Sequence, residues 1–215
     1  MTLFITFEGV EGCGKSTQAT LLGDWLSAQG QPVCMTREPG GCPISDRIRA
    51  ILLNPANSAI TADTELFLYA AARSQHVAEV IGPALQQGTT VICDRYTDAT
   101  LAYQGYARGL DLARIKHLNQ LAAGPVVPDL TLLLDMPIEC GLQRARKRNH
   151  DNATEDEGRF ESEALVFHQR VRDGYLQLAA EQPRIHVIDA DGDIPSVHRR
   201  IVDVVERCLQ QRIQL

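Results

Sequence analysis

Five short apolar runs alternate with longer stretches of helical spacing along the 215 residues of the chain. Runs that are apolar at nearly every position are typical of strands covered on both faces, as in a parallel sheet. Between them, apolar residues recur three and four positions apart, which is the spacing of one buried helix face. We therefore expect an α/β fold, a three-layer sandwich with helices on both faces of a parallel sheet.

The predicted elements follow this alternation. Strands are expected at residues 3–7, 32–36, 90–93, 130–134 and 185–188. Helices are expected at about residues 17–29, 44–53, 62–87, 112–122, 137–148, 162–181 and 196–211. Thr61 or Asp63 is expected to cap the longest helix, and an interruption near Gly82-Pro83 is left open. Residues 149–158 are polar, acidic and aperiodic, which indicates a mobile loop. We expect one domain over residues 1–215, with a mobile lid at about residues 144–159.

A glycine-rich loop follows the first predicted strand and opens the first predicted helix. Its residues, Gly9-Val10-Glu11-Gly12-Cys13-Gly14-Lys15-Ser16, fit the phosphate-binding pattern G-x-x-x-x-G-K-[ST], and Thr17 follows. Such a loop points backbone N–H groups at phosphate oxygens, and the helix adds its positive N-terminal end. Lys15 can reach the β- and γ-phosphates, and the hydroxyl of Ser16 can coordinate Mg²⁺. The alternative is an ordinary turn between a strand and a helix.

Charged residues follow the other strands at their carboxyl ends, where ligands bind in open parallel sheets. Arg37, Asp94, Arg95 and Asp135 therefore lie along the same edge as the glycine loop. Asp94 is the candidate second Mg²⁺ ligand, although a strand-end aspartate can also simply cap a turn. Arg95 is a candidate clamp for a second phosphate.

A basic cluster brackets the predicted loop at residues 149–158. It contains Arg144, Arg146, Lys147, Arg148 and Arg159. A solvated basic face is the plain explanation. A mobile lid carrying arginines is the functional one, because lid closure brings a cation to the charge of a transferred phosphoryl group and excludes water. The glycine loop has no arginine of its own, which favours the lid.

Composition limits the remaining classes of function. The net charge of −6 argues against general binding to nucleic acid. No signal peptide and no membrane-spanning run of about 20 apolar residues is expected. The cysteines show no C-x-x-C spacing, so we expect reduced thiols in a cytoplasmic protein. They are Cys13, Cys34, Cys42, Cys93, Cys140 and Cys208. Cys13 is either a small loop residue or, beside a helix N-terminus and Lys15, a redox-sensitive thiolate.

With these motifs in place, the chain closely resembles the thymidylate kinases, members of the nucleoside monophosphate kinase group of P-loop NTPases. The resemblance covers nearly the whole chain. Its motifs are Phe7-Glu8-Gly9 before the loop, Arg37-Glu38-Pro39-Gly40-Gly41, Ala71-Ala72-Arg73, Asp94-Arg95-Tyr96, Ala102-Tyr103-Gln104-Gly105 and Arg159-Phe160-Glu161. The resemblance implies strand order 2-3-1-4-5, a homodimer, and ATP-Mg²⁺-dependent phosphorylation of dTMP to dTDP for dTTP synthesis.

The resemblance also implies roles for single residues. ATP would bind on residues 9–17 and Arg144. For dTMP, Glu11 lies near the sugar 3′-hydroxyl and phosphate, Arg37 and Arg95 hold the phosphate, and Tyr103 packs on the 2′ side of the sugar. Phe67 would stack on thymine, Arg73 would reach a base carbonyl, and Gln104 would lie near the base. Gly12 stands where another branch of the family has arginine, so the catalytic cations are expected to be Lys15, Arg95 and a lid arginine, Arg148 or Arg159.

Two alternatives remain at this point. One is a kinase for another nucleotide, against which only the implied base-binding set argues. The other is a GTPase-like switch, which would need a guanine-binding N-K-x-D motif that is absent. The one D-x-x-G match, Asp189 to Gly192, follows the last predicted strand and reads as a turn.

Overall fold

The computed structural model describes residues 2–152, 159–160 and 163–213, with residues 146–152 and 211–213 as backbone only. Its centre is a parallel sheet in the order β2-β3-β1-β4-β5, which confirms the predicted strand order. The strands are β1 (Phe4–Glu8), β2 (Val33–Arg37), β3 (Thr90–Asp94), β4 (Leu130–Asp135) and β5 (Ile185–Asp189). Each predicted strand is found within one residue of its expected bounds.

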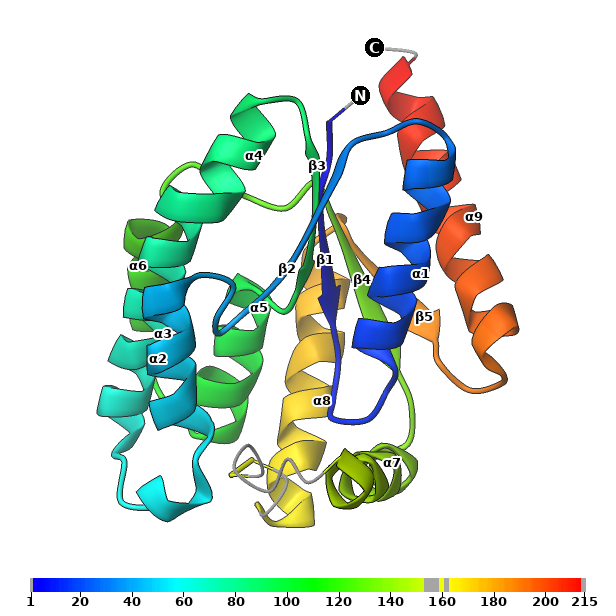
Figure 1. The fold of residues 1–215 in the computed structure, drawn as a ribbon. Helices are drawn as coiled ribbons and strands as arrows, with labels where there is room; N and C mark the ends of the chain where they lie inside the picture. The colour runs from blue at the N-terminus through cyan, green and yellow to red at the C-terminus, as the bar shows by residue number, and fades with distance from the viewer. Residues whose placement is uncertain (1, 153–158, 161–162, 214–215) are drawn as a thin grey trace.

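Helices cover both faces of this sheet (Figure 1). They are α1 (Lys15–Ala28), α2 (Pro43–Leu53), α3 (Ala62–His76), α4 (Gly82–Gln86), α5 (Thr97–Thr100), α6 (Leu112–Ala123), α7 (Ile138–Asn152), α8 (Leu165–Glu181) and α9 (Ile194–Ile213). Three shorter elements are η1 (Pro55–Asn57), η2 (Val77–Ile81) and η3 (Leu101–Ala107). Helices α1 and α9 lie on one face and α8 on the other, with α2, α3 and α6 in an outer group beside it.

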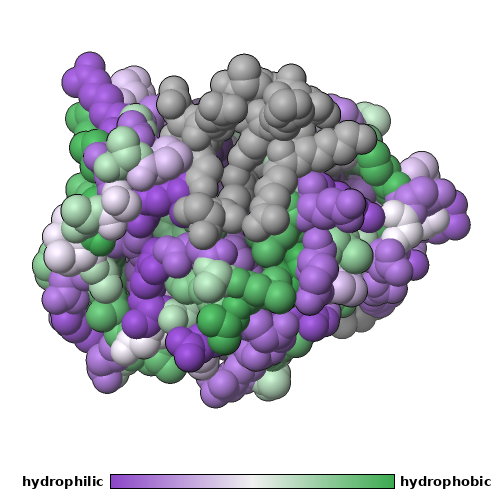
Figure 2. Space-filling model, turned by 90° about the horizontal axis from the view of Figure 1, so that it is seen from below, coloured by the Kyte–Doolittle hydropathy of each residue, from purple (hydrophilic) through white to green (hydrophobic). Residues whose placement is uncertain are grey.

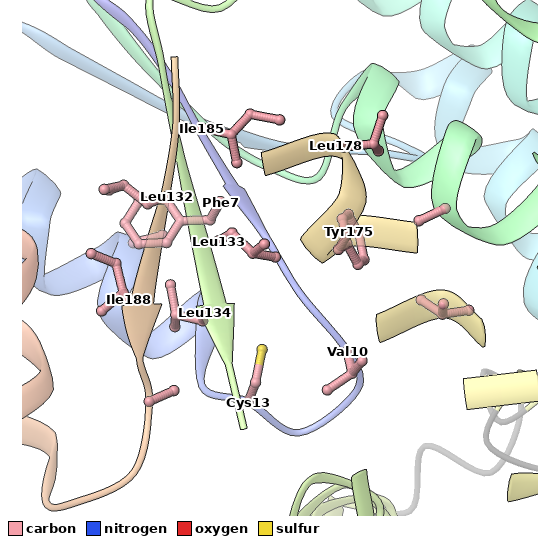
Figure 3. Close-up of a cluster of buried hydrophobic side chains, with 14 of the residues drawn as sticks. Phe7, Val10, Cys13, Leu132, Leu133, Leu134, Tyr175, Leu178, Ile185 and Ile188 are labelled. Atoms are coloured by element: carbon pink, nitrogen blue, oxygen red, sulfur yellow. The ribbon is translucent and has the colours of Figure 1, made fainter. Parts of the chain in front are cut away.

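The core forms because the central strands are apolar on both sides. Every residue of β1 is buried, and so are the first five residues of β4. Leu133 of β4 lies on the side of Tyr175 and Leu178 of α8, whereas Phe7, Leu132 and Leu134 lie on the other face of the sheet with Ile188 of β5 (Figure 3). Full burial of one such side chain contributes about 1.5–3 kcal/mol before entropy is counted. The buried threonines of these strands, Thr6 and Thr131, are joined by a 2.7 Å hydroxyl–hydroxyl hydrogen bond.

The long predicted helix at residues 62–87 is continuous but not uniform. Thr61 caps it by accepting from the backbone N–H of Thr64, as one of the two expected caps. The one-turn π-helix η2 separates α3 from α4 at the position of the expected interruption. Pro83 lacks a backbone N–H, and it lies directly after this π-turn, in the first turn of α4.

Two segments differ from the expectation. Residues 97–107 form α5 and η3, which the periodicity did not predict. Helix α7 runs to Asn152, so the predicted loop at 149–158 is wrong for residues 149–152. The rest of that loop, residues 153–158, lies outside the described residues. Across the described chain, no helix combines the length and apolar character needed to cross a bilayer.

Candidate active site

A cavity of about 1030 Å³ lies where the strands end at their carboxyl edge. Figure 2 shows the molecule from this side, with hydrophilic and hydrophobic residues next to one another on its surface. The cavity is lined by the loop after β1, the ends of β2 and β3, one side of α3, α5 and η3, and the segment between β5 and α9. One continuous space therefore joins the glycine loop to the residues expected to bind a second phosphate.

The glycine loop has the backbone that its sequence requires. Gly9, Gly12 and Gly14 have φ angles of 136°, 70° and 95°, a region that only glycine enters without strain. The ammonium of Lys15 spans the loop and donates to the carbonyls of Gly9 at 3.1 Å and Val10 at 2.8 Å. Residues 11–17 line the cavity, whereas Gly9 and Val10 do not. The backbone carbonyls of these two residues therefore bind the ammonium of Lys15 on the side away from the cavity.

Gly12 also lies directly against the first turn of α7. A Cβ atom on Gly12 would collide with the carbonyl oxygen of Gly141, and one on Gly141 would collide with that of Glu11. Two glycines facing each other therefore let the backbone of α7 touch the backbone of the loop. This is the helix that leads into the predicted lid.

Ser16 and Asp94 lie together at the floor of the cavity. The Ser16 hydroxyl donates to Oδ2 of Asp94 over 2.5 Å, from the start of α1 to the end of β3. A hydroxyl and a carboxylate are oxygen ligands that a divalent cation of the Mg²⁺ type accepts. The two candidate ligands are therefore of the chemical type that would hold such an ion.

Arg95 occupies the centre of the polar part of the cavity. Its backbone has a φ of 71°, unusual for a residue with a side chain, and its N–H donates to the carbonyl of Phe7 at 2.9 Å. The guanidinium donates to the hydroxyl of Tyr175 at 3.1 Å and to Glu11 at 3.4 Å. It also lies 4.8 Å from the ring centre of Tyr103. Since these contacts hold the side chain from three sides, the guanidinium has a defined orientation.

Glu11 carries a negative charge into this site. Burial alone would raise its pKa, but hydrogen bonding from His168, the charge of Arg95 and hydrogen bonding from Tyr103 lower the pKa to about 2. Burial raises the pKa of Tyr103 well above its ordinary value, so that its hydroxyl keeps the proton that it donates to Glu11. Glu11 is therefore ionised at neutral pH and bound by three donors.

Glu8 behaves in the opposite way. Its carboxylate is fully buried behind Arg95 and accepts from Tyr96 N–H at 2.8 Å and the Tyr175 hydroxyl at 2.7 Å. Burial, together with the charge of Asp98, raises its pKa from 4.5 to about 7, although Arg95 and these hydrogen bonds oppose the rise. Two carboxylates on either side of one arginine thus have widely separated pKa values.

The expected base-binding residues reach the cavity through a buried network. Arg73 is 1% exposed and donates to Glu38, Asn119, the Tyr96 carbonyl and Thr100 at 2.7–3.1 Å. Gln104 donates its amide N–H to Glu65 at 2.8 Å, which leaves its amide oxygen as the group that can accept. Arg37 is more open, 55% exposed and 3.5 Å from Asp46. All three line the cavity.

The expected stacking residue, Phe67, is not in the cavity. Its side chain is 53% exposed on the outside of α3, with the guanidinium of Arg114 5.6 Å from the ring centre. The aromatic residues of the cavity wall near the base-binding set are Tyr69 and Phe160, which sequence reasoning missed. Positions 67 and 69 are about 200° apart around a helix, so they face opposite directions. The expectation that Phe67 faces the cavity is therefore wrong, and Tyr69 is the aromatic residue of α3 that lines it.

The arginines of the predicted lid separate in the structure. Arg144 lines the cavity beside the glycine loop. Arg159 is instead 7% exposed, and its guanidinium donates to Glu65 at 2.6 Å and to the carbonyl of Leu52. It is not part of the cavity wall, so its expected contact with phosphate is not found. The side chains of Arg146 and Arg148 lie outside the described part of α7.

Four further residues or segments complete the comparison with expectation. Arg49 lines the cavity from α2 and donates to the carbonyl of Pro39 at 2.9 Å, although no motif indicated it. Residues within the segment 190–197 form the wall beyond the glycine loop; only a turn at 189–192 and the start of a helix near 196 were expected there. Asp135 instead pairs with Arg172 at 2.6 Å. Cys13 is 3% exposed within the hydrophobic cluster of Figure 3, which favours its interpretation as a small loop residue.

Comparison with known proteins agrees with this geometry. Residues 7–201 match the family model described as thymidylate kinase. The chain is 61% identical over 202 residues to a thymidylate kinase of Syntrophotalea carbinolica, covering 94% of each chain. It is 55% identical over 206 residues to one of Geobacter sulfurreducens, covering 95% of this chain and 97% of that one. A crystal structure of thymidylate kinase from Ehrlichia chaffeensis superposes with a TM-score of 0.75 at 35% identity, covering 95% of this chain and 98% of that chain.

The raised pKa of Glu8 predicts a pH dependence of stability. Between the unfolded pKa near 4.5 and the folded value of about 7, the folded state binds the proton more tightly. The free energy of unfolding should therefore fall as pH rises through this window, by about 3 kcal/mol, and change no further above it. Urea unfolding of wild type and Glu8→Gln at pH 5, 6, 7 and 8 measures it. The variant should gain stability relative to wild type as pH rises, and parallel profiles would contradict the assignment.

Proposed function

The chain belongs to the thymidylate kinase family, and from its cavity we propose which residues carry out the reaction of that family. The enzyme is an ATP-dependent nucleoside monophosphate kinase that uses a divalent metal. It transfers the γ-phosphoryl group of ATP to dTMP, giving ADP and dTDP for dTTP synthesis. The observation that carries the proposal is a single cavity with a glycine loop at one end and two arginines, Arg37 and Arg95, at the other.

The donor nucleotide fits the side of the cavity formed by the glycine loop. Backbone N–H groups of residues 11–17 and the N-terminus of α1 suit its phosphates, and Lys15 adds a mobile positive charge. Arg144 and the segment at residues 190–197 flank the loop and suit the rest of ATP. The proposed metal is Mg²⁺, held by Ser16 and Asp94. When bound, the ion neutralises charge on the β- and γ-phosphates.

The acceptor fits the opposite side. The phosphate of dTMP suits Arg95 and Arg37, because guanidinium groups bind phosphate through paired N–H donors. Glu11 and Tyr103 would then face the sugar. Tyr69 provides an aromatic face for the base, while Arg73 donates to a carbonyl and the amide oxygen of Gln104 accepts from the ring N–H of thymine. The same set would bind cytosine less well, since its ring nitrogen is an acceptor.

Direct in-line transfer needs only positioning and neutralisation of charge at this site. The monophosphate of the acceptor is already a nucleophile, so no general base and no phosphorylated enzyme intermediate is proposed. Lys15 and Arg95 hold the two reacting groups from opposite sides. Between the two lid candidates, we favour Arg148 as the cation that completes the site. Arg159 is already paired with Glu65 and is proposed to fix the end of the lid to α3.

The outer helices suggest the quaternary structure. Apolar side chains stand exposed on α2, α3 and α6, namely Ile44, Ile51, Phe67 and Leu121. Exposed apolar side chains gathered on neighbouring elements are typical of a protein interface. We propose that a second copy of the chain covers this face in a homodimer. A cytoplasmic location is also proposed, because both substrates are intracellular nucleotides and buried cysteines such as Cys13, Cys42 and Cys93 are free thiols.

The acceptor preference tests the function directly. In a coupled ADP-release assay with ATP and Mg²⁺, dTMP should give the highest kcat/KM among dTMP, dUMP, dCMP, dGMP and UMP. The lowest values are expected for the purine and for cytosine, because Gln104 and Arg73 then face the wrong donor and acceptor groups. Equal turnover of another monophosphate would keep a kinase of this fold but overturn the base-binding set.

Substitutions on the two faces of α3 separate base binding from assembly. Tyr69→Ala should raise the KM for dTMP about tenfold or more, because a base–aromatic stack contributes about 1–3 kcal/mol. The molecular mass of the Tyr69→Ala variant in solution should be that of the wild-type dimer. Phe67→Glu should leave this KM within about twofold but shift the enzyme from dimer toward monomer in light scattering. A raised KM for dTMP in Phe67→Glu together with an unchanged KM in Tyr69→Ala would instead support Phe67 as the base-binding residue.

The lid assignment predicts a kinetic difference between two arginines. Arg148→Ala should lower kcat by about 10³-fold with little change in KM for dTMP, as expected for loss of a cation that acts in the transition state. Arg159→Ala should instead lower the thermal unfolding midpoint, because Glu65 loses a buried partner. Single-turnover rates and thermal unfolding of both variants measure this, and an unchanged kcat in Arg148→Ala would contradict it.

A further inference from the structure

His168 on α8 contacts the candidate active site only through another residue, Glu11. Its side chain is fully buried and does not line the cavity. Its Nδ1 lies 3.2 Å from Oε2 of Glu11, the carboxylate that does line the cavity. Among the described residues, Nε2 of His168 has no hydrogen-bond partner. The hydrogen bond to Oε2 of Glu11 is therefore the one polar contact that the described residues give to this buried ring.

The two oxygens of Glu11 have different partners. Oε1 accepts from the hydroxyl of Tyr103 and, at 3.4 Å, from the guanidinium of Arg95. Oε2 accepts from His168. These donors come from three separate elements, η3, the end of β3 and α8. Because three fixed directions determine the plane of a carboxylate, Glu11 is held in one orientation rather than in a set of rotamers.

The weak member of this set is the contact with Arg95. At 3.4 Å, with one oxygen, it is far from the bidentate pair that an arginine and a carboxylate form when both are free to turn. The distance matters because Arg95 is the proposed partner of the acceptor phosphate. A Glu11 released from His168 could turn Oε2 toward Arg95, and the resulting ion pair would compete with the phosphate for the same N–H donors.

We propose that His168 is a positioning residue that fixes Glu11 for the acceptor sugar and keeps Arg95 available for the acceptor phosphate. This inference rests on the proposed role of Glu11 toward the 3′-hydroxyl of dTMP. A hydroxyl donates to a carboxylate, so a correctly turned Glu11 favours an acceptor that has the 3′-hydroxyl over one that lacks it. Hydrogen bonding from His168 is also the leading cause that lowers the pKa of Glu11 against burial.

A packing role is the plain alternative. The rings of His168 and Phe167 contact each other edge to face, with centroids 5.6 Å apart, and both side chains are buried residues of α8. In that case any well-packed side chain would serve, and the choice of acceptor would not depend on it. The two roles therefore differ in whether the donor at Nδ1 matters.

The test compares variants that keep or remove that donor. His168→Asn places an amide N–H close to the position of Nδ1, whereas His168→Leu fills the space without a donor. His168→Gln moves the amide toward the position of Nε2 and serves if the leucine variant does not fold. For each, kcat and KM are measured with dTMP and with 3′-deoxythymidine monophosphate at saturating ATP and Mg²⁺. Val171→Ala, buried on the same helix, controls for lost stability.

His168→Leu should raise the KM for dTMP about tenfold and lower the preference for dTMP over its 3′-deoxy analogue by about tenfold, with a smaller effect on kcat. His168→Asn should restore most of the preference, and Val171→Ala should leave it unchanged. Equal preference in wild type and His168→Leu, or equal losses in the asparagine and leucine variants, would overturn the inference.

Glu11→Gln separates this inference from the proposed function. If Glu11→Gln loses the preference for the 3′-hydroxyl but His168→Leu keeps it, only the positioning role of His168 fails. If Glu11→Gln keeps the preference as well, the proposed contact of Glu11 with the sugar is wrong, and the inference fails with it.

Discussion

The geometry of the active edge depends on how one guanidinium is held. Arg95 has carboxylates on two sides, Glu11 in the glycine loop and Glu8 buried behind it, and the hydroxyl of Tyr175 contacts both Arg95 and Glu8. An arginine paired fully with either carboxylate would be unavailable to an anion. The observed contacts are instead single and long on the side of the cavity, while the buried side is satisfied by neutral donors. The guanidinium of Arg95 therefore stays available to bind an anion, and the buried carboxylate of Glu8 still has hydrogen-bond donors.

The two halves of the cavity are built in different ways. The proposed donor half is mostly backbone, formed by the glycine loop and a helix N-terminus, so its recognition depends on chain geometry. The proposed acceptor half is a buried network of side chains, in which Arg73 is bound by Glu38, Asn119 and Thr100. A phosphate chain is common to many nucleotides, whereas a base and a sugar distinguish them. The side-chain network therefore lies on the half that needs selectivity.

The sequence predicted the parts that local patterns determine. Apolar runs located the strands, and the loop motif located residues 11–17, including Lys15. The expectation that ligand-binding residues follow the carboxyl ends of the strands predicted that Asp94 lies near Ser16. It failed where tertiary contacts decide. Segment η3 is buried at nearly every position, so it has no polar face and no helical periodicity to detect. Phe67 and Tyr69 could not be separated without knowing which side of α3 faces inward. Arg159 pairs with Glu65 across 94 positions of the chain, which no local pattern indicates.

The contact between Gly12 and Gly141 limits how this enzyme can change. The resemblance to the family implies arginine at the position of Gly12 in another of its branches, whereas here that position lies against the backbone of α7. A side chain cannot enter it while the helix stays in place, and the positive φ of 70° adds strain. The close packing of α7 on the loop therefore excludes an arginine from position 12. Position 12 can therefore accept a side chain only together with changes elsewhere that move α7 away from the loop.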